Sequence, residues 1–263
     1  MAKTLLVIKL GGSALGSLDT LLADLVALHQ SGLRPVVVHG GGDLISSWLK
    51  RMGVETRFVR GLRVTDAETM RVVAAVLAGL VNKELVASIT TLGGRAFGMS
   101  GVEGGFIRAS VADPELGYVG SALEIDLRPL KDVLKAGYIP VISPICLQKI
   151  TGGGGPGVLL NVNGDAVAGQ LALSLRASRL VFLTDVAGIC DASGEVIPYL
   201  SPEEAKGLIS SGVVSGGMIP KVEACILALE KVQAARIIDG RTPHALLREM
   251  EDGEGGTTIG RTR

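Results

Sequence analysis

The feature that most constrains the fold of this chain is a pair of glycine turns, each placed directly after a short apolar run. The apolar residues 5–8 lead into the turn at 9–12 (KLGG), and residues 36–38 lead into the turn at 39–42 (HGGG). Both turns open into helical patterns, which is the arrangement of a strand followed by a helix in α/β proteins. The first N–H groups of such a helix face the end of the strand and bind anions there. The sequence therefore predicts an α/β fold with phosphate-binding turns.

The order of patterns along the rest of the chain favours one mainly parallel sheet shared by two lobes. Strand and helix patterns alternate through most of the 263 residues, and a second run of alternation starts near Ser178. We therefore expect an N-terminal lobe of residues 1–177 and a C-terminal lobe of residues 178–263. With no low-complexity linker between them, the two lobes are expected to meet along a continuous sheet.

Local signals predict several individual elements. Helices are expected over residues 17–31, 43–52 and 65–92. The third helix begins with a predicted capping box, in which Thr65 is the cap and Glu68 stands three residues later. Between residues 95 and 125, short strands broken by glycine and proline indicate hairpins attached to the sheet, which makes this stretch a candidate lid. Residues 151–157 are so rich in glycine that they are expected to form a hairpin tip.

Charge and composition argue against several classes of partner. Lys plus Arg and Asp plus Glu number 26 each, so no net charge attracts nucleic acid or an anionic membrane. Aromatic residues make up 3% of the chain, which offers few stacking surfaces for bases. The odd number of cysteines, three, argues against a disulfide framework, and their spacing suggests no metal site. Because neither a leader nor a membrane-spanning window is recognised, we expect a cytoplasmic protein with no membrane partner.

A polar cluster at residues 161–165 (NVNGD) carries the first sign of chemistry. It ends an apolar strand and precedes a helical run, and ligands of open α/β sheets bind at such strand ends. Taken alone, Asn163 or Asp165 could simply cap the next helix. Asp165 could also stand between the ammonium groups of Lys9 and Lys221, which would otherwise repel each other.

Six sequence blocks in order resemble the amino acid kinase family, and within it the acetylglutamate kinases. The resemblance spans nearly the whole chain. A single glycine turn would be weak evidence, whereas six blocks in register make coincidence improbable. The blocks are residues 9–12 (KLGG), 39–42 (HGGG), 61–66 (GLRVTD), 161–165 (NVNGD), 183–189 (LTDVAGI) and 217–222 (GMIPKV).

The resemblance implies a three-layer αβα sandwich, the amino acid kinase fold, with a β-hairpin lid over the acceptor site. It implies that ATP phosphorylates the γ-carboxylate of N-acetyl-L-glutamate, the second step of arginine biosynthesis. The N-terminal lobe would bind acetylglutamate and form a homodimer, and the C-terminal lobe would bind ATP. Arginine-inhibited members carry an extra N-terminal helix, so the start of this chain at its first strand favours an uninhibited enzyme.

Catalytic and acceptor-binding roles follow residue by residue from the resemblance. The lysines at Lys9 and Lys221 stabilise the transferring phosphoryl group, and Asp165 orients them. Arg63 pairs with the α-carboxylate of acetylglutamate. Backbone donors come from Gly11, Gly12, Gly41 and Gly42, the last two toward the acceptor, and Asn161 and Asn163 bind the acetylamino acid.

The nucleotide-binding residues implied by the resemblance form two further segments beside Gly11 and Gly12. These are Asp185, Val186, Ala187, Gly188, Ile189, Cys190, Val213, Val214, Ser215 and Gly217. The chain shows no cluster of histidine and carboxylate side chains that would form a protein-held metal site. We therefore expect Mg²⁺ to be bound mainly by ATP oxygens and water.

Other functions remain open at this level. The nearest alternative is a kinase of the same fold that acts on an aminoadipate linked to a carrier protein, although no basic run that would bind a carrier is present. Uridylate, carbamate and aspartate kinases match the blocks around Arg63 and Asn161 less well. A non-catalytic nucleotide-binding protein of this fold is disfavoured by the two lysines and Asp165. A Rossmann dehydrogenase is disfavoured because the first strand lacks the Gly-x-Gly-x-x-Gly turn.

Some residues near these blocks are expected to be structural. His39 is interpreted as a turn residue packed under the glycines. Asn82 and Lys83 are expected on a solvated helix face, and Trp48 is expected in the core or a subunit contact.

Overall fold

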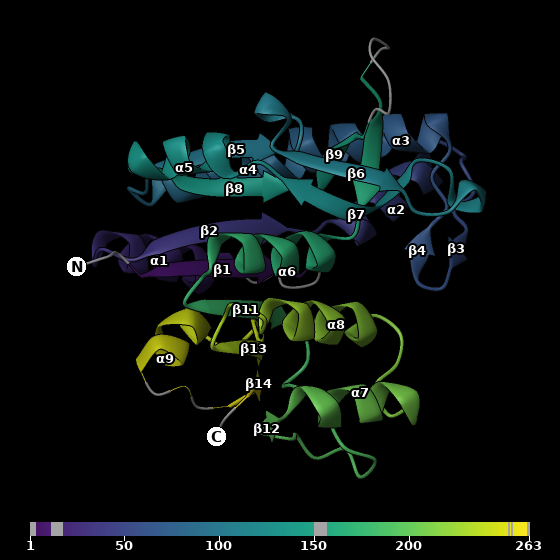
Figure 1. The fold of residues 1–263 in the computed structure, drawn as a ribbon. Coiled ribbons are helices and arrows are strands. Elements are labelled where there is room, and N and C mark those ends of the chain that lie inside the picture. Colours follow the sequence, from purple (N-terminus) through teal and green to yellow (C-terminus); the bar gives the residue numbers. More distant parts are fainter. Residues whose placement is uncertain (1–3, 12–17, 150–156, 252, 254, 262–263) are drawn as a thin grey trace.

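An eight-stranded sheet forms the centre of the molecule. The computed structural model describes residues 4–11, 18–149, 157–251, 253 and 255–261. The strand order is β12-β14-β13-β11-β1-β2-β8-β5, and Figure 1 shows these strands from the yellow C-terminal region to the teal edge. Only the β13–β14 pair is antiparallel among the described strands of this sheet. The strands are β1 (Leu5–Leu10), β2 (Arg34–His39), β5 (Ala96–Ser100), β8 (Ile139–Ser143), β11 (Arg179–Thr184), β12 (Tyr199–Leu200), β13 (Ala234–Asp239) and β14 (Thr257–Gly260).

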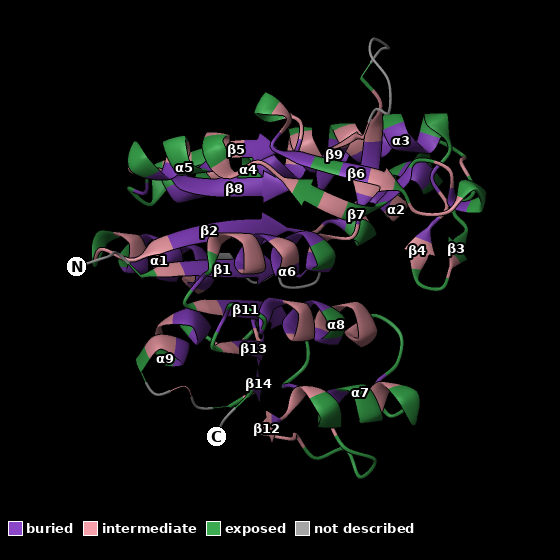
Figure 2. Ribbon diagram, in the orientation of Figure 1, coloured by how far each residue is buried: buried purple, intermediate pink, exposed green. Residues whose placement is uncertain are grey.

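Helices cover both faces of the sheet, which confirms the three-layer sandwich. In β1, Val7 packs in the core of one face, whereas Leu6 and Ile8 pack in the core of the other. The strands are accordingly buried along most of their length (Figure 2). One face carries α5 (Leu127–Lys135), α6 (Gly164–Leu175), α7 (Pro202–Ser210) and α8 (Met218–Ala228). The other face carries α1 (Leu18–Gln30), α2 (Gly42–Arg51), α3 (Ala67–Ala74), α4 (Asn82–Thr91) and α9 (Ala245–Glu251).

The stretch predicted as a hairpin lid divides between two structures. Strand β5 belongs to the main sheet, whereas β6 and β7 form an antiparallel hairpin in a closed four-stranded barrel with β9 and β10. A separate hairpin, β3–β4, stands beside α2 at the end of the molecule (Figure 1). The predicted hairpin tip at residues 151–157 lies almost wholly outside the described residues. The bounds are β3 (Phe58–Val59), β4 (Leu62–Arg63), β6 (Ile107–Val111), β7 (Val119–Ile125), β9 (Ile145–Gln148) and β10 (Leu159–Val162), with short 3₁₀ turns at η3 (Glu103–Gly105) and η4 (Pro114–Leu116).

The long helix predicted over 65–92 is present but begins differently. Asp66, not Thr65, is the N-cap, and its side chain accepts a hydrogen bond from the Thr69 N–H. The predicted capping box is therefore wrong, and the Thr65 hydroxyl accepts from the Asn161 Nδ2 instead of from a helix N–H. A π-helical segment, η2 (Ala75–Val81), separates α3 from α4.

The same helical run corrects the expectation that no stretch reaches membrane-spanning length. Within the described residues, Ala67–Thr91 is the one helical run long and apolar enough to cross a membrane by length and composition. Its apolar side chains fill the core on one face of the sheet, which accounts for its hydropathy. These side chains are Met70, Val72, Val73, Val76, Leu77, Val81, Leu85 and Ile89.

Helices α6 and α8 pack against each other at close range. A Cβ atom placed on Gly169 of α6 would lie 2.8 Å from the Ala224 Cβ and 2.9 Å from the Ala224 carbonyl oxygen of α8. Any side chain at position 169 would push the helices apart. Asp165 lies one turn earlier in α6, and Lys221 lies one turn earlier in α8. The glycine therefore permits the close approach of the two helix starts.

Candidate active site

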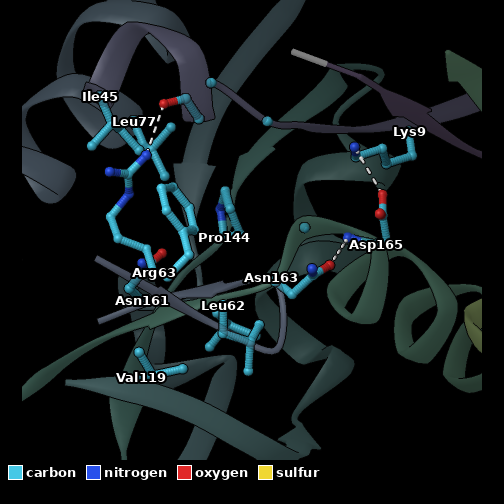
Figure 3. A pocket seen from close by; sticks show the side chains of 17 residues that line it. Lys9, Ile45, Leu62, Arg63, Leu77, Val119, Pro144, Asn161, Asn163 and Asp165 are labelled. Carbon is cyan, nitrogen blue, oxygen red and sulfur yellow. Dashed lines mark hydrogen bonds and ion pairs between the residues drawn. The ribbon is translucent and has the colours of Figure 1, made fainter. Parts of the chain in front are cut away.

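A cavity of about 210 Å³ opens where the carboxyl ends of β1 and β2 meet the barrel and the β3–β4 hairpin. It brings together seven of the residues implied by the sequence blocks, which come from four separate stretches of the chain. In Figure 3, Arg63 lies at one end of the cavity, the Lys9–Asp165 pair lies at the other, and Asn163 lies between them. The seven residues are Lys9, Gly41, Gly42, Arg63, Asn161, Asn163 and Asp165.

One end of the cavity leads into a largely buried cluster of three charges, of which Lys9 and Asp165 line the cavity. The Lys9 Nζ lies 2.8 Å from Asp165 Oδ1, and the Lys221 Nζ lies 3.2 Å from Asp165 Oδ2. Burial lowers the pKa of Lys9; the carboxylate of Asp165 opposes this shift and the ammonium of Lys221 adds to it. The cluster carries one more positive than negative charge when all three groups are ionised. It is therefore suited to an anion.

The local structure explains why Asp165 faces the lysines. Asn163 is the N-cap of α6, and its Oδ1 accepts hydrogen bonds from the N–H groups of Asp165 and Ala166 at 2.7 Å and 3.3 Å. The capping interpretation is thus correct for Asn163, which also lines the cavity. Asp165 does not cap the helix but lies in its first turn, where its carboxylate pairs with both lysines.

The other end of the cavity presents the Arg63 guanidinium. Its Nη2 donates to the Gly42 carbonyl at 3.0 Å and to the Ser46 hydroxyl at 2.8 Å, and the guanidinium carbon lies 4.7 Å from the centre of the Phe58 ring. The side chain is buried, and its Nη1 has no hydrogen-bond partner among the described residues. A buried unpaired donor of a guanidinium is costly, so an anionic ligand would satisfy it.

Thr65 links Arg63 to Asn161. Its hydroxyl donates to the Arg63 carbonyl at 2.8 Å and accepts from the Asn161 Nδ2 at 3.3 Å, and the residue is fully buried. Sequence reasoning treated Thr65 as a helix cap and so missed this contact. The position of Thr65 within the sequence block 61–66 was the one sign that it lies beside the acceptor-binding residues.

The glycines of the two turns differ in whether their N–H groups already have a hydrogen-bond acceptor within the protein. The Gly11 N–H donates to the Leu183 carbonyl at 2.9 Å, so it is already occupied, contrary to the expectation of a free donor. Gly12 lies outside the described residues. Gly41 is the N-cap of α2 and Gly42 its first residue, and both line the cavity. Among the described residues of the two turns, the free donors are therefore those at the start of α2.

The residues expected to bind nucleotide do not line this cavity. Asp185, Val186 and Ala187 are exposed in the loop after β11, and Cys190 is half-buried. Gly188 and Ile189 are buried, and the Ile189 N–H donates to the hydroxyl of Thr257 at 2.8 Å. In the second segment Val214 is a core residue, whereas Val213, Ser215 and Gly217 are exposed. Gly217 has a direct link to the charged cluster, because its carbonyl accepts from Lys221 Nζ at 3.0 Å.

Two expectations for neighbouring residues change. Asn82 is fully buried and not on a solvated face, and its side chain contacts His39. Trp48 is 37% exposed, so it is not a core residue of this chain, and its subunit contact stays a prediction. His39 is buried behind its glycine turn, as expected.

Comparison with known proteins agrees with the site. The model of the amino acid kinase family matches residues 4–239. An acetylglutamate kinase of Dehalococcoides mccartyi strain CBDB1 is 47% identical over 97% of this chain and 94% of its own length. The acetylglutamate kinase of Cereibacter sphaeroides strain ATCC 17029 is 45% identical over 98% of this chain and 88% of its own. The crystal structure of smu.665 from Streptococcus mutans UA159 superposes with a TM-score of 0.86 at 27% identity, covering 98% of this chain and 99% of that one. This chain therefore belongs to the amino acid kinase family.

Proposed function

We propose that this protein transfers the γ-phosphoryl group of ATP to the γ-carboxylate of N-acetyl-L-glutamate. The observation that carries the proposal is that the cavity has a cationic group at each of its two ends. A lysine pair held by one carboxylate lies at one end, and a guanidinium with a free Nη1 lies at the other. An acetylated dicarboxylic amino acid has two carboxylates to match these two ends. Relatives at 45–47% identity that carry the name acetylglutamate kinase support the same activity.

The reaction requires placement and charge neutralisation more than acid–base chemistry. An oxygen of the γ-carboxylate forms a bond to the γ-phosphorus while the bond from that phosphorus to the bridging oxygen of ADP breaks. The acceptor is already ionised, so no residue has to remove a proton. Lys9 and Lys221 would neutralise the oxygens of the transferring group, and Asp165 would keep the two ammonium groups at a fixed spacing. The N–H groups at the start of α2 would contact the phosphoryl group as it passes from ATP to the carboxylate.

Arg63, Asn161 and Asn163 would bind the part of the acceptor that does not react. The free Nη1 of Arg63 suits the α-carboxylate, and the amides of the two asparagines suit the acetylamino group. A cavity of about 210 Å³ suits a small molecule. The lack of a basic run in the sequence favours free acetylglutamate over an acceptor attached to a carrier protein.

We further propose that the nucleotide is bound as MgATP by the segments 185–190 and 213–217. The described residues contain no group of three His, Cys, Asp or Glu side chains placed to hold a metal ion, and Asp165 is engaged with two lysines. The ion would therefore be held by phosphate oxygens and water. Turnover should follow the concentration of the MgATP complex when magnesium is varied at fixed ATP.

The free enzyme is proposed to be a cytoplasmic homodimer. Leu92 and Phe97 are 44% and 43% exposed, and both lie near the outer edge of the sheet formed by β5. An edge strand with apolar neighbours can pair with a second copy. Light scattering on the purified protein gives the mass, and a monomer at micromolar concentration would contradict the dimer.

The activity itself is tested by coupled detection of ADP over a panel of acceptors. N-acetyl-L-glutamate should be used, and glutamate, aspartate, carbamate, uridylate and free aminoadipate should be used poorly. Hydroxylamine should trap the product as a hydroxamate, because an acyl phosphate reacts with it. Absence of the hydroxamate at millimolar acceptor would contradict the proposed function.

A further inference from the structure

A buried pair of side chains, His39 and Asn82, lies behind the glycine turn that starts α2. His39 ends β2 and Asn82 starts α4, and their relative exposures are 0% and 1%. The Asn82 Nδ2 lies 3.2 Å from the His39 Nε2 and also donates to the Val141 carbonyl at 2.9 Å. The His39 Nδ1 lies 2.9 Å from the carbonyl oxygen of Gly40. The ring thus connects the helix start to the turn.

These contacts assign the protons on the pair. Asn82 Oδ1 accepts from the Lys83 Nζ at 3.0 Å, which identifies the opposite atom of the amide as the nitrogen donor. That donor faces His39 Nε2, so Nε2 is the acceptor and carries no proton. Nδ1 must then carry the proton and donate it to the Gly40 carbonyl. Burial lowers the pKa of His39 to about 4, so the ring is neutral at physiological pH.

The bond to Gly40 fixes the direction of the next N–H group. In a trans peptide the carbonyl of Gly40 and the N–H of Gly41 point in opposite directions. The carbonyl points to the buried ring, so the Gly41 N–H points away from it, on the side where Gly40, Gly41 and Gly42 line the cavity. The Gly40 N–H is held as well, by the Leu10 carbonyl of β1 at 3.0 Å. No acceptor within the described part of the chain takes the Gly41 N–H.

We propose that His39 and Asn82 are positioning residues that aim the Gly41 N–H at the oxygens of the transferring phosphoryl group. Neither side chain lines the cavity, so both act through the Gly40–Gly41 peptide. The proposal rests on the proposed phosphoryl transfer, because it names how one of the donors in that step is held. Asn82 selects the tautomer, His39 holds the carbonyl, and the peptide is oriented before substrate arrives.

The first experiment reads the tautomer without any substrate. Nitrogen-15 spectra of the imidazole groups distinguish a protonated from an unprotonated ring nitrogen. His39 should show a protonated Nδ1 and an unprotonated Nε2 from pH 5 to pH 9. A protonated Nε2 in the neutral ring would overturn the proposal. This result stands even if the wild-type protein fails to phosphorylate N-acetyl-L-glutamate, an outcome that would contradict the proposed function separately.

The second experiment compares two substitutions of His39. The amide nitrogen of asparagine can take the place of Nδ1, whereas leucine has similar bulk and no donor. His39→Leu should lower kcat by roughly 10- to 100-fold with little change in the KM of either substrate, because the lost interaction forms mainly in the transition state. His39→Asn should recover most of that loss. Equal loss in both variants, or no loss in a folded His39→Leu variant, would overturn the proposal.

The third experiment separates positioning from stability. Replacing both partners by apolar residues avoids an unpaired acceptor on the ring, so His39→Leu/Asn82→Leu should melt at a higher temperature than Asn82→Leu alone. Its kcat should nevertheless stay as low as that of His39→Leu. If the double variant regained kcat together with its melting temperature, the pair would be structural only. If a leucine variant does not fold, His39→Asn and the nitrogen-15 spectra still decide the matter.

Discussion

The two ends of the cavity satisfy their charges in different ways. At the lysine end, Asp165 pairs with Lys9 and Lys221 within the protein, at 2.8 Å and 3.2 Å. At the other end, Arg63 has contacts with Gly42, Ser46 and Phe58, but its Nη1 has none among the described residues. The first end is therefore organised before a ligand arrives, whereas the second is completed by one.

This difference assigns the two ends to different kinetic constants. A preorganised group of charges acts most strongly on charge that develops during the reaction, and so on kcat. A group completed by the non-reacting part of a ligand contributes equally to the ground state and the transition state, and so to KM. Five variants test this separation.

The largest effect is expected at the lysines. Lys9→Ala and Lys221→Ala should each lower kcat by roughly 10²- to 10³-fold, as for loss of one preorganised transition-state donor. Steady-state kinetics at saturating substrates gives kcat, and Lys206→Ala, at an exposed position of α7, is the matched control. A lysine whose alanine variant kept wild-type kcat would be structural, and the two-lysine mechanism would then be wrong.

Asp165→Asn should affect both rate and stability. It leaves the buried Lys9 ammonium and the partly buried Lys221 ammonium without their carboxylate, which should lower the free energy of unfolding by about 2–4 kcal/mol, measured by urea titration. The carboxylate raises the pKa of Lys9 against the effect of burial, so its removal should lower that pKa further. Because the ammonium form is the active one, the fall of kcat at alkaline pH should begin at lower pH than in the wild type. An unshifted alkaline limb would contradict the coupling.

Arg63→Ala should raise the KM of N-acetyl-L-glutamate by roughly 10- to 100-fold, as for loss of a charged hydrogen bond to a carboxylate. The KM of ATP should change little. The control is Arg57→Ala, at an exposed position just before the β3–β4 hairpin. An equal rise in both KM values would show that Arg63 supports the whole cavity and not the acceptor alone.

Ser46→Ala should give the smallest effect, a rise of roughly 2- to 5-fold in the KM of the acceptor. The hydroxyl accepts from Arg63 Nη2, which keeps a second acceptor in the Gly42 carbonyl. Loss of one neutral acceptor has a modest effect. Ser47→Ala, exposed on the same helix, should match the wild type. A change in kcat instead of KM would contradict the assignment of the Arg63 end of the cavity to KM.

The fold class and the family could be predicted from sequence because both depend on patterns along the chain. The apolar runs before the glycine turns became β1 and β2, neighbours at the centre of the sheet. The site residues could be assigned from the resemblance for the same reason, because the blocks stand in the family's order. Seven of the assigned residues line one cavity. Their roles stay predictions until variants are measured.

Contacts between segments that are distant in the chain could not be predicted from the sequence. Asn82 has polar neighbours along the helix, so a solvated face was a natural expectation, yet β2 and β8 bury it. Thr65 has the spacing of a cap, but a partner 96 residues away, Asn161, competes for its hydroxyl. The Gly11 N–H was expected to be free, and the neighbouring strand β11 takes it. In each case tertiary packing overrides a signal that was sound locally.

The close contact of Gly169 with Ala224 links packing to electrostatics. It lies one helical turn behind the Asp165–Lys221 pair, and it sets how near the starts of α6 and α8 can come. A methyl group at position 169 would push α6 and α8 apart and lengthen the ion pair without touching either of the paired side chains. A substitution of Gly169, although it changes only packing between two helices, would then lower kcat in the same way as the loss of a charged side chain.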